Sequence, residues 1–295
     1  MTPRVKSGRG CCRLGAYILG AVLVAACNGT ADPTQSKLAA FAPSTLAISE
    51  NVSALTCGDH GEVGSDVGRL TNNVWNKQAI GGAPYEQCIL VRESPNGKEY
   101  GWAWSWPVDS DSVVAYPETV IGWKPWVGGR SSDERLPIRI DAIQTMRLSY
   151  VIETVSNASH NLATSIWLTR SGTTGFFPRP DDISSELMIW TDDTGFSPAG
   201  EYVGKVTIDD LDFEIWWAKD WGDNSGAASN RWGYIAYRSQ TKTRSATLDI
   251  KKILLDAVNR GMISAEHYVP SIEVGNEVIN GTGETWIRSL SLDVR

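Results

Sequence analysis

Apolar and polar residues alternate with a period of two over most of the chain, in short runs separated by clusters of Gly, Pro, Asn and Asp. Successive side chains of a β-strand point to opposite faces of a sheet, so this pattern predicts half-buried strands. Clear examples are residues 100–106, 136–140, 146–152, 186–190, 213–217 and 234–237. Because no strand–helix–strand spacing accompanies them, we predict an all-β sandwich of two packed antiparallel sheets.

One segment departs from this pattern. From Leu248 to Asn259, apolar residues recur at helical spacing and share one face. Gly261 follows and is expected to end the helix, because glycine readily adopts the left-handed conformation common at that position. We therefore expect one short helix among the strands.

The first 26 residues have the features of an export signal. Four basic residues precede an uncharged apolar run, 14–26, that is too short to span a bilayer. The run ends in small residues before Cys27, which resembles a bacterial lipobox, where that cysteine would be lipidated. An ordinary signal peptide cut nearby is the alternative. Residues 27–50 are small, polar and contain proline, as in a spacer, so the folded domain is expected over 51–295.

Charge restricts the expected partners and location. The net charge of −7 becomes −11 without the basic residues of the signal, which argues against binding to nucleic acid or to anionic membranes. A lipid on Cys27 is the one membrane contact that we expect. Asn28 follows Cys27, which resembles outer-membrane sorting of lipoproteins, so an outer-membrane lipoprotein and a secreted protein are the two expected outcomes.

The cysteines leave one pairing open. Removal of the signal takes Cys11 and Cys12 with it and leaves Cys27, Cys57 and Cys88. If Cys27 carries a lipid, Cys57 and Cys88 remain as a pair that an oxidising compartment would allow to form a disulfide. Two free buried thiols are the alternative.

The chain contains no motif for nucleotide, metal or serine-hydrolase chemistry, and its three histidines are isolated. We therefore expect no metal and no cofactor. Aromatic rings and carboxylates are abundant instead, with 13 Trp and 34 acidic residues. This combination suits carbohydrate, because the C–H faces of sugars stack on tryptophan and glycoside cleavage requires two carboxyl groups.

Several aromatic residues could serve either binding or packing. Alternation places four rings on one strand face, where they either form a sugar platform or fill the core: Tyr100, Trp102, Trp104 and Trp106. Trp123 and Trp126 lie in a turn-rich stretch, where we expect exposure.

Two strand-like stretches place glutamates in unusual surroundings. Glu186 shares a strand face with Met188 and Trp190, and Glu277 lies beside Gly275, which would leave space for a ligand. Glutamate is nevertheless mostly a surface residue. Spacing alone does not select this pair over four other glutamates: Glu153, Glu214, Glu273 and Glu284.

Resemblance to a known family does select it. Residues 186–190, Glu-Leu-Met-Ile-Trp, resemble the nucleophile strand of glycoside hydrolase family 12, the β-jelly-roll endoglucanases and xyloglucanases. Further stretches resemble that family in the same order, namely residues 72–76, 114–118, 124–126, 196–200 and 275–283. Together they cover roughly residues 55–295, the whole expected domain.

The resemblance implies roles for individual residues. Glu186 matches the nucleophile and Glu277 the general acid/base of a retaining mechanism, which places their carboxyl groups about 5–5.5 Å apart. The charge of Glu186 is expected to raise the pKa of Glu277. A disulfide between Cys57 and Cys88 is also implied. Residues expected to bind substrate are Asn73, Trp75, Met188, Trp190 and Pro198, with core packing as the alternative for Met188 and Trp190.

Ser165 marks a departure from the family. It stands where many members carry an aspartate that hydrogen-bonds the nucleophile. A hydroxyl can donate a hydrogen bond but cannot share a proton as a carboxylic acid does. We therefore expect the pH optimum to differ from that of aspartate-bearing relatives.

The resemblance thus implies a monomeric, retaining endo-β-1,4-glucanase on a two-sheet jelly roll, with an open cleft across the concave sheet. Its expected partner is a β-glucan, namely cellulose-type glucan, mixed-linkage glucan or xyloglucan. A xyloglucan-specific endoglucanase or transglycosylase is one alternative. The other is a non-catalytic glycan-binding sandwich, against which the presence of both Glu186 and Glu277 argues.

Overall fold

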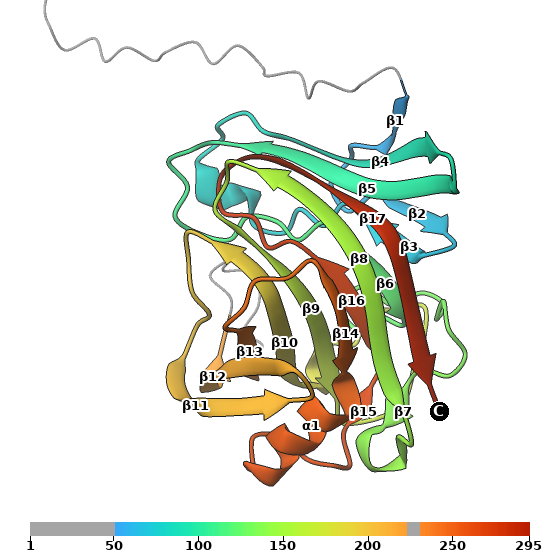
Figure 1. Ribbon diagram of the computed structural model, residues 1–295, viewed down its shortest axis with the longest axis vertical. Helices are drawn as coiled ribbons and strands as arrows, with labels where there is room; N and C mark the ends of the chain where they lie inside the picture. The colour runs from blue at the N-terminus through green and yellow to red at the C-terminus, as the bar shows by residue number, and fades with distance from the viewer. Residues whose placement is uncertain (1–50, 223–230) are drawn as a thin grey trace, which may run out of the picture. The chain divides into compact units, whose positions relative to one another are not determined.

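The computed structural model describes residues 51–222 and 231–295. The expected signal, the spacer and Cys27 lie outside these residues. Strands dominate the described part and form two sheets, so the predicted all-β sandwich is confirmed (Figure 1). No helix of the described residues is long and apolar enough to cross a bilayer.

The smaller sheet has six strands, among them the long neighbours β8 and β17 (Figure 1). Every pair in it is antiparallel. In spatial order its strands are β1 (Val52–Thr56), β4 (Glu86–Ser94), β5 (Gly97–Trp106), β17 (Gly281–Val294), β8 (Met146–Ser156) and β14 (Ser245–Asp249).

The larger sheet has eleven strands. Nine form a continuous path: β11 (Glu201–Ile208), β12 (Leu211–Trp221), β13 (Trp232–Ser239), β10 (Ile183–Thr194), β9 (His160–Thr169), β16 (Ser271–Gly275), β6 (Glu118–Gly122), β3 (Gly68–Thr71) and β2 (Glu62–Ser65). The short strand β15 (Tyr268–Val269) pairs with β7 (Ile138–Arg139) and with β9.

The expectation of two wholly antiparallel sheets is wrong at one place. Strands β10 and β13 run parallel, with Glu186 opposite Tyr234. The chain leaves β10, forms the β11–β12 hairpin and returns as β13 between β12 and β10. Strand β13 is antiparallel to β12 and therefore runs in the same direction as β10, beside which it lies.

The core lies between the sheets. Leu187 and Ile189 of β10 are fully buried and belong to the same cluster as Leu148 and Ile152 of β8. Alternation therefore leaves the neighbouring side chains of β10 on the opposite face of the larger sheet. We call this face, which carries Glu186, Met188 and Trp190, the outer face.

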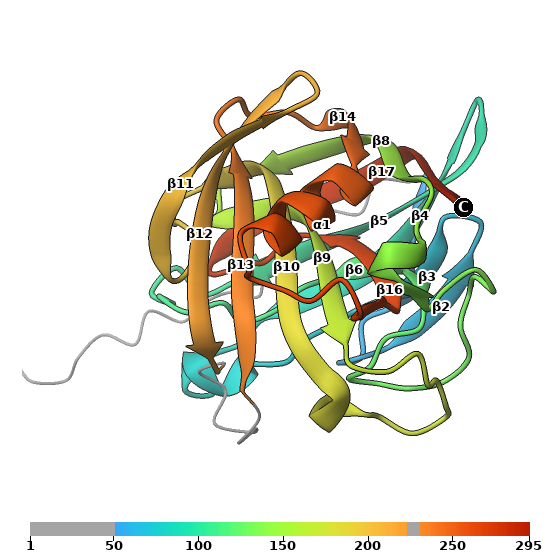
Figure 2. The ribbon, with the colours of Figure 1, turned by 90° about the horizontal axis from the view of Figure 1, so that it is seen from below.

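The helix α1 (Ile250–Asn259) lies across one end of the two sheets (Figure 2). It begins later than expected, because Leu248 belongs to β14 and Asp249 caps the helix by accepting a hydrogen bond from the backbone N–H of Lys252 at 3.1 Å. Gly261 follows the last turn with φ of +69°. Three short 3₁₀ turns accompany it: η1 (Lys77–Ile80), η2 (Ile140–Ala142) and η3 (Pro180–Asp182).

The tryptophan stripe is part of the core. Trp102, Trp104 and Trp106 are at most 1% exposed and pack in one buried cluster, so the sugar-platform hypothesis is wrong for them. Trp123 is also fully buried, contrary to expectation, and its Nε1 donates to the carbonyl of Gly175 at 2.9 Å. Trp126 is partly exposed.

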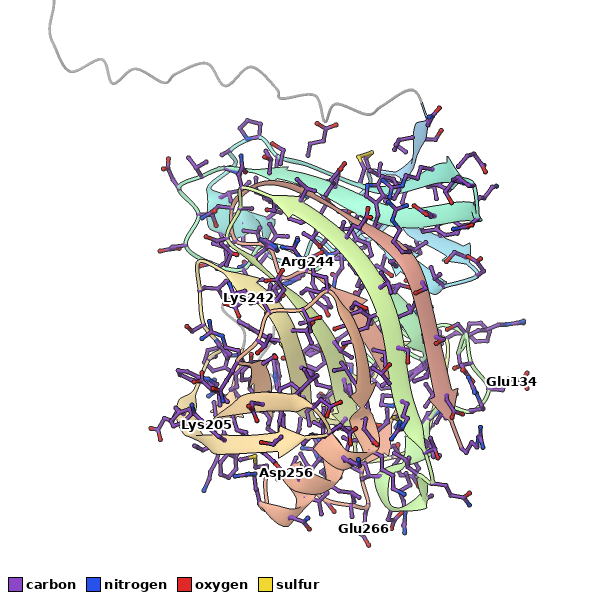
Figure 3. The ribbon with its side chains drawn as sticks, in the orientation of Figure 1. Glu134, Lys205, Lys242, Arg244, Asp256 and Glu266 are labelled. Atoms are coloured by element: carbon purple, nitrogen blue, oxygen red, sulfur yellow. A yellow bond between two sulfur atoms is a disulfide. The ribbon has the colours of Figure 1, made fainter. Side chains whose placement is uncertain are left out.

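A disulfide and an arginine join separate strands. Cys57 and Cys88 form a disulfide, seen as a yellow bond in Figure 3, that joins the segment after β1 to β4. Arg244, labelled in the same view, connects the sheets: Nε donates to Asp192 of β10 at 2.6 Å and Nη1 to the carbonyl of Thr154 in β8 at 2.7 Å.

Loss of the disulfide should destabilise the protein without affecting its site. The bridge spans 31 positions in sequence, and a cross-link closing such a loop contributes about 3–4 kcal/mol by restricting the unfolded chain. We expect the double variant Cys57→Ser/Cys88→Ala to lower the free energy of unfolding by up to that amount in urea titrations. An unchanged midpoint would contradict this prediction.

Candidate active site

Glu186 lies on the outer face, in the middle of the larger sheet. It is 9% exposed, and Ser165 of the adjacent strand β9 donates its hydroxyl to Glu186 Oε1 at 3.1 Å. Burial raises the pKa of Glu186 to about 8, and the charge of Glu277 adds to this shift, while the bond from Ser165 opposes it. The expected contact between Ser165 and this glutamate is therefore present.

Glu277 follows β16 instead of lying within it, because that strand ends at Gly275. Asn161 of β9 holds Glu277 at two points: its Oδ1 accepts the backbone N–H of Glu277 at 2.8 Å, and its Nδ2 donates to the Oε2 of the carboxyl. Burial raises the pKa of Glu277 to about 7, against the effect of the bond from Asn161. Burial is thus the main cause of the raised pKa of Glu277.

The turn that carries Glu277 is held in place by its buried neighbour Asn276. Asn276 is fully buried, and its Nδ2 donates to the carbonyl of Asn161 at 2.6 Å. Its Oδ1 accepts hydrogen bonds from Trp102 Nε1 at 2.7 Å and from the hydroxyl of Thr285 at 2.8 Å, both in the smaller sheet. The position of Glu277 therefore depends on contacts that reach through the sandwich.

The two carboxyls form an acid and base pair. Each has a pKa raised by burial, and Glu186 responds to the charge of Glu277. Near neutral pH such a pair holds about one proton, which leaves one group able to donate a proton and the other able to act as a base or nucleophile.

The four other glutamates left open by the sequence are used differently. Glu153 is in the smaller sheet and pairs with Arg92 and Arg288, whereas Glu284 is exposed on β17. Glu214 of β12 is partly exposed and lies near Lys205. Glu273 is completely buried against Lys124. Of these six glutamates, Glu186 and Glu277 are the two buried carboxyls that are not paired with a basic residue of the described part of the chain.

Gly275 does not leave space for a ligand, contrary to expectation. A Cβ atom at this position would lie 2.4 Å from the carbonyl oxygen of Pro117 and 2.9 Å from the Cβ of Glu118. The missing side chain therefore permits close approach of β6 to β16.

The other candidate binding residues gather around one aromatic cluster of the outer face. Met188 and Trp190 are 1% and 2% exposed, and Trp75 packs against them while remaining partly exposed. Pro198 is buried in the loop after β10, and Phe196 of that loop contacts Trp190 at 5.0 Å between ring centroids. Met188 and Trp190 are thus packed as the alternative hypothesis expects.

Asn73 lies at the edge of this region. Its Nδ2 donates to Glu118 Oε1 at 3.1 Å, and its backbone carbonyl accepts the N–H of Tyr116 at 2.8 Å. The side chain is partly exposed. Asn73 is therefore held in a fixed orientation beside β6.

Sequence reasoning identified Ser165 beside Glu186 but missed Asn161, which orients Glu277, and the buried partner Lys124 of Glu273. Asn161 lies 116 residues from Glu277, and Lys124 lies 149 residues from its partner Glu273. No local pattern marks such contacts. Sequence reasoning also missed three tryptophan rings that pack edge to face near Glu186. Their centroids are 5.1–5.5 Å apart, and the residues are Trp126, Trp167 and Trp232.

Within residues 51–222 and 231–295, no group of three or more His, Cys, Asp or Glu side chains could hold a metal ion.

Known proteins are similar to this chain in sequence. Residues 69–295 match the sequence profile of glycosyl hydrolase family 12. Endoglucanase S of Pectobacterium parmentieri is 32% identical over 229 residues, which cover 77% of this chain and 81% of that protein.

Two solved structures are also similar. The native family 12 xyloglucanase from Bacillus licheniformis shares 26% identity at a TM-score of 0.71, over 83% of this chain and all of that one. A metagenome-derived family 12 endoglucanase shares 29% identity at a TM-score of 0.64, over 83% of this chain and 99% of that one. The chain belongs to glycoside hydrolase family 12.

Proposed function

We propose that the protein is a retaining endo-β-1,4-glucanase in which Glu186 is the nucleophile and Glu277 the general acid/base. One observation carries the proposal: two buried carboxyls interact on the outer face, and each is oriented by its own hydrogen-bonding partner on β9, Ser165 or Asn161. Retaining glycosidases require this combination of one ionised and one protonated carboxyl group.

The reaction proceeds in two displacements. In the first, ionised Glu186 attacks the anomeric carbon while Glu277 gives its proton to the departing glycosidic oxygen, which breaks the glycosidic bond and forms a glycosyl ester on Glu186. In the second, Glu277 takes a proton from water, and the water oxygen attacks the anomeric carbon. This breaks the ester, releases a hemiacetal with the original configuration and restores the proton to Glu277.

The hydrogen bonds suit these roles. Ser165 donates to Glu186 and so favours its ionised form. Burial raises the pKa of both carboxyls, so the pair shares a proton near neutral pH, and the proposed mechanism places that proton on Glu277. When Glu186 becomes an ester, its negative charge disappears and Glu277 can ionise more readily, as the second step requires.

Cellulose-type glucan, mixed-linkage glucan and xyloglucan are the proposed substrates. The similar proteins include endoglucanases and a xyloglucanase. Trp75 is proposed to stack on a glucosyl ring, because it stays partly exposed within the aromatic cluster. Asn73 lies two residues away and is proposed to hydrogen-bond the same sugar, whereas Met188, Trp190 and Pro198 are buried and are proposed to support this region from within.

Replacing either carboxyl should abolish turnover. We expect Glu186→Gln and Glu277→Gln to lower kcat/KM by at least about a thousandfold, because each amide has the shape of the acid without its proton chemistry. Reducing-sugar release from carboxymethylcellulose, mixed-linkage glucan and xyloglucan measures this loss. Proton NMR of the first products should show retained anomeric configuration.

Glu284→Gln is the matched control, since Glu284 is exposed on the other sheet, and it should keep normal activity. Wild-type protein that binds these glucans without cleaving them would indicate a glycan-binding protein instead. Xyloglucan as the sole substrate, or products longer than the starting oligosaccharide, would indicate the specialised xyloglucanase or transglycosylase.

Removal of the Ser165 hydroxyl should move the pH profile. Without this donor the ionised form of Glu186 is less stabilised, so its pKa rises. We expect the acid limb of the kcat/KM profile of Ser165→Ala to move to higher pH, with the alkaline limb nearly unchanged. An acid limb that stays in place would show that this bond does not tune the nucleophile.

We also propose that the protein is exported and anchored by a lipid on Cys27, as its signal-like N-terminus suggests. Intact mass of the mature protein from the producing cell should then show a diacylglycerol adduct on a chain beginning at Cys27, and Cys27→Ala should abolish the adduct. A mature chain beginning elsewhere without the adduct would indicate an ordinary secreted, monomeric enzyme.

A further inference from the structure

A lysine and two glutamates are buried together on the outer-face side of the larger sheet. Lys124, which follows β6, donates to Glu118 Oε1 at 2.6 Å and to Glu273 Oε2 at 2.7 Å. Both glutamates are completely buried and Lys124 is 4% exposed. Burying three ionisable groups is costly unless they compensate one another, so their charge states are tightly linked.

The two glutamates differ in their hydrogen bonds, because Glu118 accepts both of its donors, Lys124 and Asn73, on Oε1 alone. Both oxygens of Glu273 are paired, Oε2 with Lys124 and Oε1 with the hydroxyl of Ser271 at 2.9 Å. Glu118 Oε2 is buried without a partner, and burial raises the pKa of Glu118 well above its usual range. Burial alone would lower the pKa of Lys124, but the two carboxyls outweigh it and raise it. The raised pKa of Glu118 favours its protonated form, which leaves Glu273, with a donor on each oxygen, as the carboxylate that pairs with Lys124.

Glu273 is also the carboxylate nearer to the nucleophile. Strand β16 lies between β6 and β9, and Glu273 is the register partner of Ser165, whose hydroxyl donates to Glu186. Glu118 lies one strand farther away, opposite Gly275. The negative charge of this buried group is thus placed directly beside the residue that holds Glu186.

Other groups facing Glu186 come from each neighbouring element. Burial raises the pKa of Tyr116 and of Tyr234 well above the usual range, so both remain neutral. The charged or titratable neighbours that remain are Glu277, Glu273 and Lys124. Of these, Glu277 is part of the reacting pair, which leaves Glu273 and Lys124 as fixed charges.

We propose that Glu273 is a positioning residue of the active site, whose buried negative charge, held beside Ser165 by Lys124 and Ser271, sets the pH at which the nucleophile becomes ionised. Its charge opposes ionisation of Glu186 and makes that carboxylate more basic. Glu118 acts as the neutral partner of the group and as the acceptor for Asn73. This inference rests on the proposed role of Glu186.

The test compares two isosteric variants in the intact protein. In Glu273→Gln the amide can still pair with Lys124 and Ser271, but the charge beside Ser165 is removed. We expect the acid limb of the kcat/KM profile on mixed-linkage glucan to move to lower pH by about half a unit. This direction is opposite to that expected for Ser165→Ala.

Glu118→Gln is the matched control. Like Glu273→Gln, it replaces one carboxyl of the buried cluster by an amide, but this carboxyl is neutral. The acid limb of its kcat/KM profile should therefore coincide with that of the wild type. Thermal unfolding of both variants checks that they fold. If Glu273→Gln does not fold, Ser271→Ala serves instead: it removes one donor to Glu273, so the charge of Glu273 is less compensated and we expect the acid limb to move slightly to higher pH.

The outcomes separate this inference from the proposed function. A shift in Glu273→Gln alone supports it. A folded, active Glu273→Gln with an unmoved acid limb, or an equal shift in Glu118→Gln, overturns it and leaves the proposed function standing. A wild-type protein that cleaves none of the glucans would instead overturn the proposed function.

Discussion

The alternation of side chains across the larger sheet is the constraint on which the rest of the structure depends. One face of β10 contributes Leu187 and Ile189 to the core, and the other carries Glu186. A shift of one residue in register would exchange these two sets. The same residues that stabilise the sandwich therefore fix the height and direction of the nucleophile, so that packing and chemistry are specified by a single pattern.

Burial disfavours the charged forms of Glu186, Glu277 and Lys124, but only the two glutamates have their pKa shifted in the direction that burial alone would give. It raises the pKa of both Glu186 and Glu277, which makes one proton available to the pair near neutrality. At Lys124 the neighbouring carboxyls overcome it, and the lysine stays charged. Burial on this face thus favours the protonated form of a carboxyl. Hydrogen bonds from Ser165, Asn161 and Ser271 stabilise the ionised form of the carboxyl that each one contacts.

Local patterns predicted local features well. Alternation located the main strands and put Glu186 beside Met188 and Trp190, and helical spacing found α1 to within two residues. Alternation assigns residues to two faces, however, without saying which face is buried, so the stripe around Trp104 stayed open until the structure placed it in the core. The parallel β10–β13 pair and the contact of Asn161 with Glu277 depend on distant segments, for which the sequence carries no periodic signal.

Asn276 gives the two carboxyls different mechanical supports. Glu186 is held within its own sheet, whereas the turn bearing Glu277 is tied through Asn276 to Trp102 and Thr285 of the opposite sheet. Because Asn161 also holds Glu277 to the larger sheet, a breathing motion that changes the spacing between the sheets would strain the support of Glu277 and leave that of Glu186 unchanged. The stereochemical course of glycoside cleavage depends on the distance between the two carboxyls. That distance in turn depends on how tightly the two sheets pack against each other.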